Sequence, residues 1–269
     1  FGVLLSLVAQ LRRNRFDLVF DLQGLFRTAS LGWLSGCANR YGMAKAAEFA
    51  HIFYTHKITQ DNGCIHLVDY YLKIIKAAGV SNPAVEFVLP QDSAAAESVD
   101  KLLAVHNIKQ GNYAVLVPGS AHSDKCWPVE RFAAIASKIS SQFGLSVIAT
   151  GTASEKSTVE KLKAAANVPI ENFAGLTNLS ELIALLKGAK VVISNDTGPG
   201  HIAAALGRPL VLIFGPSNPA RVAPYGRSNC IAAVEPFGRG LKADSTNPGH
   251  DIKEVTVDEV YHKVCEQIS

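Results

Sequence analysis

Short runs of β-branched and other apolar residues alternate with longer segments of helical periodicity along most of this chain. In the first part we expect strand, helix, strand and helix, in that order, at residues 16–22, 26–34, 40–43 and 66–78. Apolar residues in the last of these helices recur at the spacing of one helix face: Leu67, Tyr70, Tyr71, Ile74 and Ile75. Alternation of this kind predicts a parallel sheet with helices on both faces.

The alternation loosens between residues 80 and 112, where Pro, Gly and polar residues surround one Ala-rich helix. We therefore expect two domains, residues 1–105 and 106–269. The second should contain strands at 113–117, 146–150, 190–195 and 209–214, and helices at 129–142, 154–166, 179–187 and the end of the chain. Five or six parallel strands within about 130 residues form a complete doubly wound domain. The first domain has fewer strands and is expected to be incomplete.

The most informative segment is residues 190–207, where a β-branched run passes through a polar turn into a small-residue helix. The first backbone N–H groups of a helix are unpaired and can hold a phosphate. Asp196, Thr197, Gly198 and His201 lie at this turn. They can bind the sugar and phosphate parts of a nucleotide, although Asp196 or Thr197 could also simply cap the helix, and His201 could pack against the sheet.

The other strands of the second domain also end in polar turns, and the carboxyl ends of parallel strands meet at one edge of a sheet. Lys125 lies in one of these loops, where it could neutralise a diphosphate or be an ordinary surface lysine. Glu155 could bind a ribose, but Thr152 and Glu155 also fit a capping box. In the first domain, the segment from Asp21 to Arg27 is either part of an acceptor site or an ordinary strand-to-helix turn.

Composition excludes several other classes of protein. The formal charge is +3, with Lys and Arg dispersed, which gives no support for nucleic-acid binding and suits small anionic ligands. Five scattered cysteines without a C-x-x-C pair indicate reduced thiols in a cytoplasmic protein and no zinc site. The opening apolar run is too short to span a bilayer and lacks the preceding charge of a signal peptide. Because it resembles the middle of a helix, we expect an N-terminal segment to be missing.

The motifs together resemble those of the bacterial lipopolysaccharide heptosyltransferases of glycosyltransferase family 9, most closely the heptosyltransferase I type. The resemblance runs through segments 17–27, 53–54, 124–128, 196–201 and 215–217. It implies a GT-B-like α/β fold of two Rossmann-like domains. The first would be the acceptor side, and the second would bind the donor ADP-heptose. The implied partners are this nucleotide sugar and a lipid-linked saccharide acceptor at the inner face of the inner membrane.

The resemblance also implies roles for individual residues. Ser120 and Lys125 would contact the diphosphate, and Glu155 would contact the ribose. Thr177 would lie near the adenine, and the 196–201 turn would hold the ADP-sugar. Ala121 stands where the family often has a second hydroxyl, and Ala47 stands where an acceptor-binding arginine is common. The catalytic aspartate of the family is expected upstream of Phe1.

The implied reaction is a single inverting displacement at the anomeric carbon, without a cofactor. A metal-independent reaction is expected because no Asp-x-Asp motif lies in a suitable loop. One alternative is a fragment that binds a nucleotide sugar without catalysis, and another is a family 9 transferase with a different nucleotide sugar. A single Asp-Thr-Gly in an α/β pattern argues against an aspartic protease. The lack of G-x-G-x-x-G argues against a nicotinamide-dependent oxidoreductase.

Overall fold

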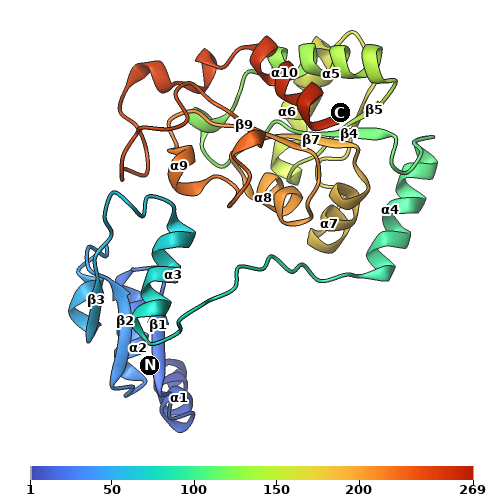
Figure 1. Ribbon diagram of the computed structural model, residues 1–269. Coiled ribbons are helices and arrows are strands. Elements are labelled where there is room, and N and C mark those ends of the chain that lie inside the picture. Colours follow the sequence, from blue (N-terminus) through green and yellow to red (C-terminus); the bar gives the residue numbers. More distant parts are fainter. Residues whose placement is uncertain (1, 269) are drawn as a thin grey trace. The chain divides into compact units, whose positions relative to one another are not determined.

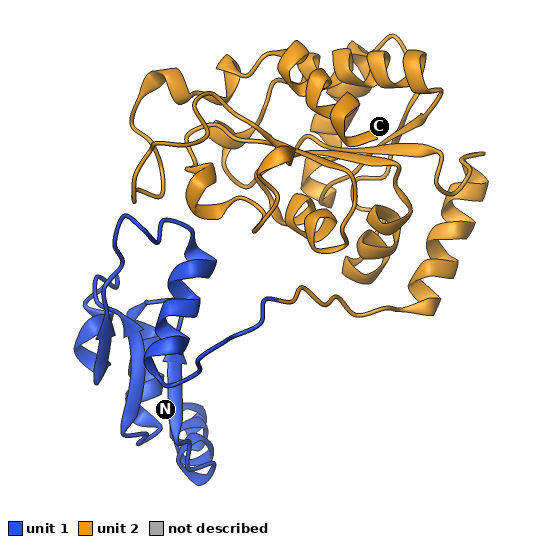
Figure 2. Cartoon of the chain, viewed as in Figure 1, with its two compact units in different colours: residues 1–85 blue, residues 86–269 orange. Residues whose placement is uncertain are grey.

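The computed structural model describes residues 2–268 and divides the chain into two compact units, residues 1–85 and 86–269 (Figure 2). The sequence predicted the division after residue 105. The difference arises from the Ala-rich helix α4 (Ser93–Val105), which packs against a helix of the second unit. Val99 and Leu103 of α4 are buried in the core of that unit, so the helix belongs to it.

The first unit contains one three-stranded parallel sheet in the order β1-β2-β3. Its elements are α1 (Gly2–Arg13), β1 (Leu18–Asp21), α2 (Phe26–Leu34), β2 (Asn39–Met43), the 3-10 helix η1 (Ala50–Phe53), β3 (His56–Ile58) and α3 (Leu67–Ala77). The strands at 16–22 and 40–43 and the helices at 26–34 and 66–78 are confirmed. β3 was not predicted. None of the side chains of α1 is buried, and the core of this unit is small, centred on Tyr70 and Ile74 of α3.

The second unit is built on a six-stranded parallel sheet (Figure 1). Its strands are β4 (Tyr113–Val117), β5 (Ser146–Ala149), β6 (Ile170–Asn172), β7 (Val191–Asn195), β8 (Leu210–Ile213) and β9 (Ile231–Ala232). Its helices besides α4 are α5 (Val129–Phe143), α6 (Lys156–Ala165), α7 (Leu179–Gly188), α8 (Gly198–Ala205), α9 (Pro219–Val222) and α10 (Val257–Ile268). Short 3-10 helices are η2 (Ser123–Lys125), η3 (Ala153–Glu155), η4 (Ser228–Cys230), η5 (Pro248–His250) and η6 (Ile252–Glu254).

The strand order is β6-β5-β4-β7-β8-β9. Counted within the unit, this order is 3-2-1-4-5-6, the doubly wound arrangement that binds nucleotides where the order reverses. The reversal lies between β4 and β7. Helices α5, α6 and α10 cover one face of the sheet, and α4, α7 and α8 cover the other (Figure 1). The four strands placed by the sequence are confirmed as β4, β5, β7 and β8, and with β6 and β9 the total of six agrees with the expected five or six.

The strands at the centre of this sheet are apolar because both faces are covered. Every residue of β4, β7 and β8 is buried. The final helix begins as the sequence indicated, with the Thr256 hydroxyl accepting a hydrogen bond from the Glu259 amide at 3.2 Å and the Glu259 carboxylate accepting one from the Thr256 amide at 2.7 Å. Val255 and Val260 are buried in one cluster, where they fix the entry of the chain into α10.

Candidate functional site

A cavity of about 410 Å³ opens at the carboxyl ends of β4, β5 and β7, beside the point where the strand order reverses. Its walls also include the start of α7. The predicted binding residues that line it are Ser120, Ala121, Lys125, Glu155, Thr177, Asp196, Thr197 and Gly198. The remaining one, His201, contacts the cavity through Asp196. The structure thus brings together residues that lie up to 81 positions apart in the sequence, from 120 to 201.

The turn after β7 carries the helix N-terminus of this cavity. Thr197 is the N-cap residue of α8, and its side chain makes no capping hydrogen bond to the helix. Instead its hydroxyl lies 3.1 Å from the Ser194 hydroxyl, behind the turn. The Gly198 end of α8 therefore faces the cavity without a side-chain cap, which leaves this end suited to an anionic group. The alternative in which the Thr197 side chain forms a capping hydrogen bond to α8 is therefore wrong.

Asp196 is the most buried charged group of the site, with a side chain only 9% exposed. Its Oδ1 lies 3.3 Å from Nε2 of His201, and its Oδ2 lies 3.7 Å from Nζ of Lys125. Burial of the Asp196 carboxyl acts to raise its pKa, but the hydrogen bond with His201 and the charge of Lys125 help to outweigh burial, and the pKa is lowered. Asp196 is therefore an ionised acceptor held between two cationic or hydrogen-bonding side chains.

A buried amide that the sequence gave no reason to single out holds these loops in place. The Asn195 side chain accepts a hydrogen bond from the Trp127 amide at 3.1 Å and donates one to the Pro118 carbonyl at 2.8 Å. The Trp127 indole in turn donates to the Val255 carbonyl at 2.8 Å. Asn195 lies at the end of β7, and its partners Pro118 and Trp127 lie on either side of the loop that carries Lys125. It thus ties the tip of β7 to the tip of β4 and to that loop.

Glu155 forms the predicted capping box and also lines the cavity. Its Oε2 accepts hydrogen bonds from the amide and the hydroxyl of Thr152, at 2.6 and 2.9 Å, so the capping box is real. Its Oε1 faces Gly119 at the tip of β4, where a Cβ would lie 1.9 Å away. Glycine at this position allows the carboxylate to lie against the β4 loop and line the cavity.

The start of α7 forms another part of the cavity wall. Asn178 and Glu181 cap this helix reciprocally, with the Asn178 side chain accepting from the Glu181 amide at 3.0 Å. Thr177 precedes the cap, and Leu179 and Leu182 add apolar surface to the wall. The cavity therefore has a charged lining residue in Lys125 and apolar lining from α7, a combination that suits a molecule with an anionic part and a flat heterocycle.

The helix α8 approaches the sheet closely behind the site. A Cβ on Gly200 would lie 2.2 Å from Cδ1 of Leu212 on β8. Only a residue without a side chain allows α8 to begin at this depth, directly against the sheet. The small residue was visible in the sequence, but its contact with Leu212 was not.

The first unit holds a second carboxylate at a strand tip, but its surroundings differ. Asp21 is 6% exposed, and its oxygens accept hydrogen bonds from the amides of Gln23 and Gly24 and from the hydroxyls of Thr28 and Tyr54. The bond from Tyr54 measures 2.7 Å. Burial, reinforced by Asp21, raises the pKa of the Tyr54 hydroxyl and keeps it a donor. Of the two alternatives for this segment, the structure supports the strand-to-helix turn.

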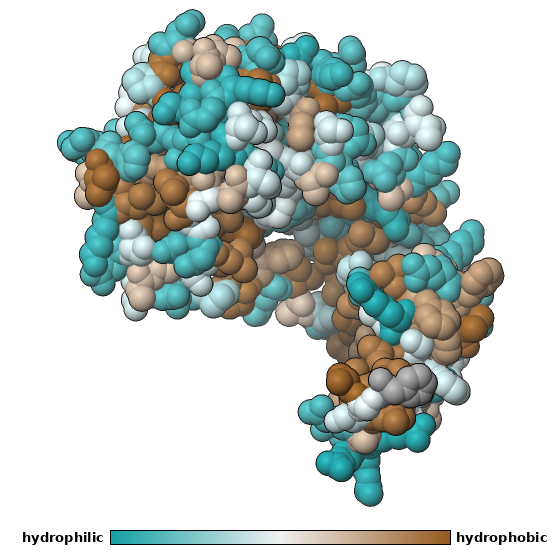
Figure 3. Space-filling model, turned by 180° about the vertical axis from the view of Figure 1, so that it is seen from behind, coloured by the Kyte–Doolittle hydropathy of each residue, from teal (hydrophilic) through white to brown (hydrophobic). Residues whose placement is uncertain are grey.

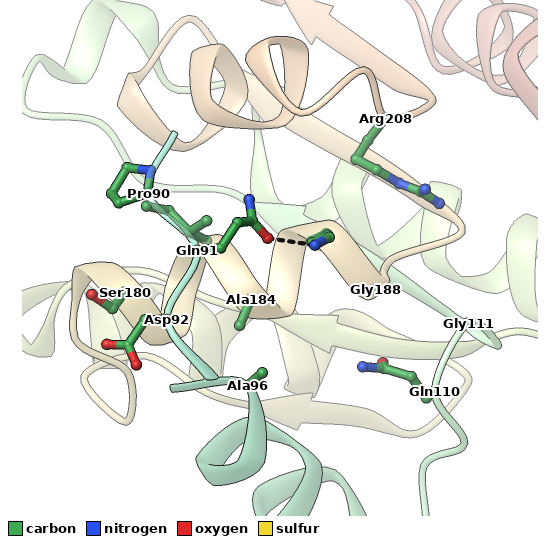
Figure 4. Close-up of a pocket in the computed structure, with 12 residues that line it drawn as sticks. Pro90, Gln91, Asp92, Ala96, Gln110, Gly111, Ser180, Ala184, Gly188 and Arg208 are labelled. Carbon is green, nitrogen blue, oxygen red and sulfur yellow. Dashed lines mark hydrogen bonds between the residues drawn. The ribbon is translucent and has the colours of Figure 1, made fainter. Parts of the chain in front are cut away.

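Another cavity in the second unit, of about 470 Å³, lies at the opposite, amino edge of the sheet (Figure 4). Its wall includes Gln91, Gln110, Lys187 and Arg208. Lys187 donates a hydrogen bond to Gln91, and Arg208 donates one to the Ala189 carbonyl. Lys187 and Arg208 thus each spend one hydrogen bond on the protein itself, and ligands of open parallel sheets bind at the carboxyl edge. The cavity at Asp196 is therefore the candidate site, although it is smaller.

Within residues 2–268, no group of three or more His, Cys, Asp or Glu side chains is arranged to hold a metal ion. No helix in the same range is long and apolar enough to cross a membrane. Cys37, Cys64 and Cys230 are free thiols and are buried.

Comparison with known sequences agrees with this geometry. The model of glycosyltransferase family 9 (heptosyltransferase) matches residues 4–248. The chain is 30% identical to the lipopolysaccharide core heptosyltransferase OpsX of Haemophilus influenzae over 237 residues, which cover 86% of this chain and 66% of that protein. It is 23% identical to lipopolysaccharide heptosyltransferase 2 of Escherichia coli, covering 96% of this chain and 76% of that protein. The chain thus spans about two thirds to three quarters of the length of these relatives.

Solved structures give the same answer for the fold. The E. coli ADP-heptose lipopolysaccharide heptosyltransferase II matches with a TM-score of 0.72 and 21% identity, over 97% of this chain and 79% of that one. The E. coli heptosyltransferase WaaC with ADP matches with a TM-score of 0.68 and 25% identity, over 97% of this chain and 75% of that one. The predicted fold class, a GT-B-like α/β fold with two Rossmann-like units, is confirmed. With a family model that matches nearly all of its length, the chain belongs to glycosyltransferase family 9, the heptosyltransferases.

Proposed function

We propose that this protein transfers heptose from ADP-heptose to the inner core of lipopolysaccharide by an inverting displacement. The observation that carries the proposal is the cavity at the Asp196 turn, where Lys125, the start of α8 and a buried carboxylate converge. Support for the donor comes from one relative, the E. coli heptosyltransferase WaaC, whose structure contains ADP.

We assign the charged and the apolar lining of the cavity to different parts of the donor. Lys125 and the first turn of α8 would hold the diphosphate, with Ser120 beside them, because a cation and unpaired helix amides both favour negative charge. Glu155 would accept a hydrogen bond from a ribose hydroxyl through the oxygen that faces Gly119. Thr177 would lie beside the adenine, with the apolar lining from α7.

Asp196 and His201 would contact the heptose end of the donor. The ionised Asp196 carboxylate would accept hydrogen bonds from sugar hydroxyls while keeping Lys125 and His201 in position. Neither cavity carboxylate is proposed as the base. Asp196 is ion-paired with Lys125, and Glu155 is hydrogen-bonded to Thr152.

The proposed reaction forms one bond and breaks one. The acceptor hydroxyl oxygen attacks the anomeric carbon of the heptose and loses its proton to a base. The bond between that carbon and the β-phosphate oxygen breaks, and ADP leaves with the electron pair. Lys125 and α8 would stabilise the charge that develops on the departing diphosphate, since positioned cations and dipoles act most strongly where charge develops.

The acceptor is proposed to be a lipid-linked saccharide, presented at the cytoplasmic face of the inner membrane. The first unit would contribute the acceptor side. Asp21 is not part of this proposal, since its carboxylate is already hydrogen-bonded within the unit.

Calorimetric titration with ADP, UDP and ADP-heptose tests the donor assignment. We expect ADP and ADP-heptose to bind at least about tenfold more tightly than UDP. The Asp196→Ala variant should lose the extra affinity for ADP-heptose over ADP. The matched control is Asp258→Ala, because Asp258 also pairs with a lysine, Lys138, but is exposed and far from the cavity in sequence. Equal affinity for UDP, or an Asp196→Ala variant indistinguishable from Asp258→Ala, would contradict the donor site.

A transfer assay separates the enzyme from a non-catalytic binding protein. Release of ADP from ADP-heptose in the presence of a heptose-deficient lipopolysaccharide acceptor is expected, together with a product of inverted anomeric configuration. Tight binding of ADP-heptose without transfer would favour the binding protein. Transfer from a different nucleotide sugar would favour the other family 9 alternative.

A further inference from the structure

The first unit carries a group of large apolar side chains on its surface, formed by α2, η1 and the residue that precedes η1. We call this group the aromatic patch: Phe26, Trp33, Phe49, Ile52 and Phe53. Four of these side chains are exposed, with exposed fractions of 50% for Phe26, 53% for Trp33, 75% for Phe49 and 60% for Ile52. Hydrophobic residues are also visible on the face of this unit shown in Figure 3. Single exposed apolar residues are common, but a contiguous group of this size marks an interaction surface.

The patch is contiguous because Phe53 joins its two sides. The ring of Phe53 lies 5.3 Å from that of Phe26 in an edge-to-face arrangement, and 6.0 Å from that of Trp33. Helix α2 packs closely against η1, the element that contains Ile52 and directly follows Phe49. Tyr54, the next residue, is buried and bonded to Asp21, so the patch rests on an ordered base.

The backbone at Phe49, whose side chain is exposed, has a strained conformation. Glu48 and Phe49 have φ values of 50° and 57°, the left-handed region that bulky residues rarely occupy. Glu48 is fixed there by the amide of Phe26, which donates to its carboxylate at 3.1 Å. Strained conformations of this kind persist mostly where they position a functional group.

Basic residues lie in or next to the elements that carry the patch. Arg27 follows Phe26 in α2, Arg12 donates a hydrogen bond to the Leu34 carbonyl at the end of α2, and Arg40 donates one to the Phe53 carbonyl. Between residues 26 and 54 the only acidic residue is Glu48. Charge is also uneven along the chain: residues 1–85 contain nine Lys and Arg and five Asp and Glu, whereas residues 86–269 contain seventeen and eighteen.

We propose that the aromatic patch docks this protein onto the headgroup region of an anionic lipid bilayer. Trp and Phe favour the boundary between water and hydrocarbon, and Arg side chains beside them are attracted to anionic headgroups. The positive charge of these elements selects a lipid surface over a second copy of this unit, which would bring like charges together. The patch and its arginines therefore form one docking surface.

This inference deepens the proposed function, because it names the surface that brings the enzyme to its lipid-linked acceptor. It rests on the described geometry of the first unit. The two proposals fail separately. Loss of vesicle binding leaves ADP binding at the Asp196 cavity untouched, and loss of ADP binding leaves vesicle binding untouched.

Trp33 provides a direct probe. The chain has two tryptophans, and the other, Trp127, is 1% exposed. Vesicles of phosphatidylcholine mixed with phosphatidylglycerol should shift Trp33 fluorescence to shorter wavelength and protect it from acrylamide quenching. Vesicles of phosphatidylcholine alone should bind roughly tenfold more weakly, and added salt should weaken binding to the anionic vesicles. A Trp127→Phe variant that keeps its fold assigns the signal to Trp33.

Two variants test the patch, with vesicle co-sedimentation as the common readout. Phe49→Ser combined with Ile52→Ser removes exposed apolar surface, and we expect roughly tenfold weaker vesicle binding. Arg27→Gln removes one charge and should reduce both the affinity and its salt dependence. The control is Phe237→Ser, because Phe237 is equally exposed, at 57%, but lies in the second unit.

Three results would overturn the proposal. The first is equal vesicle affinity of the patch double variant and the Phe237→Ser control. The second is vesicle affinity that does not depend on lipid charge. The third is a Trp33 fluorescence shift that depends on protein concentration in the absence of lipid. The last result would assign the patch to self-association. Thermal unfolding and ADP titration of each variant show that the fold and the nucleotide cavity are intact.

Discussion

Two carboxylates at strand tips, Asp21 and Asp196, share a local pattern and differ in their surroundings. Each lies at the carboxyl end of a parallel strand and shortly before a helix, α2 or α8. The donors to Asp21 are two neighbouring amides, Thr28 and the buried Tyr54. The partners of Asp196 are side chains at the edge of an open cavity, Lys125 and His201.

The difference shows how a structural aspartate is distinguished from a binding one. A carboxylate surrounded by fixed donors from its own turn and from a buried neighbouring side chain has no capacity left for a ligand, and it stabilises the fold around it instead. A carboxylate paired with long or partly exposed side chains keeps room on the cavity side. Four predictions follow from this comparison, from the largest expected effect to the smallest.

Substitution of Asp21→Ala should destabilise the first unit by about 3 kcal/mol, since it leaves several buried donors without an acceptor. Trp33 fluorescence during urea unfolding reports on this unit, and Trp127 reports on the second. ADP affinity should remain at the wild-type value. A large loss of ADP affinity with unchanged unfolding would reverse the roles of the two aspartates.

Substitution of Lys125→Ala should weaken ADP binding about 30-fold, or about 2 kcal/mol, because the diphosphate loses its charged partner. Lys138→Ala is the matched control, since Lys138 forms an exposed ion pair with Asp258 in the same unit. Calorimetry at low and high salt checks the result. Equal affinities of the two lysine variants would show that Lys125 is only a surface residue.

Substitution of Asp196→Asn should weaken ADP-heptose binding about tenfold, or about 1.4 kcal/mol, while ADP itself changes less. The amide keeps the size of the side chain but loses the charge that holds Lys125 and His201 and accepts from the sugar. Competition between ADP and ADP-heptose measures the ratio directly. An unchanged ratio would mean that Asp196 does not contact the sugar.

The pH dependence of stability gives the smallest effect. The pKa of Asp196 is lowered in the folded protein, so its ionised form contributes stability above the ordinary pKa of about 4, and this contribution is lost as the pH falls through the folded value. The wild type should therefore lose stability relative to Asp196→Asn below about pH 4. Urea unfolding of the two proteins from pH 6 downward, in steps of about half a unit, checks the slope. Parallel curves would show that the carboxylate is not stabilised by its partners.

The sequence predicted the longer elements well, because their apolar periodicity is strong. It missed β3, β6 and β9, which have three, three and two residues. β3 and β6 mix polar and apolar residues, as in His56-Lys57-Ile58, and a run of three shows no period. The predicted domain boundary lies after residue 105 and the observed one after residue 85. The difference arises because the sequence of an Ala-rich helix with loops on both sides does not show which unit the helix packs against.

The site could be predicted from the sequence as far as the parallel strands of the sheet could be predicted. Polar residues after several parallel strands must meet at one edge, and this predicts that Lys125 and Asp196 lie close together. The role of Asn195 was not predictable, because its partners Trp127 and Pro118 lie 68 and 77 residues away. For Glu155, the capping box is confirmed, whereas ribose binding stays a prediction that its position in the cavity wall allows.

The side-chain amide of Asn195 also has a kinetic consequence. Because it fastens the β4 tip and the Lys125 loop to β7 by buried hydrogen bonds, these walls are set when the unit folds rather than when a nucleotide arrives. A ligand that enters a preorganised cavity loses little affinity to the ordering of loops. Association should therefore be a single fast step, and the nucleotides that this cavity distinguishes should differ mainly in how long they stay bound.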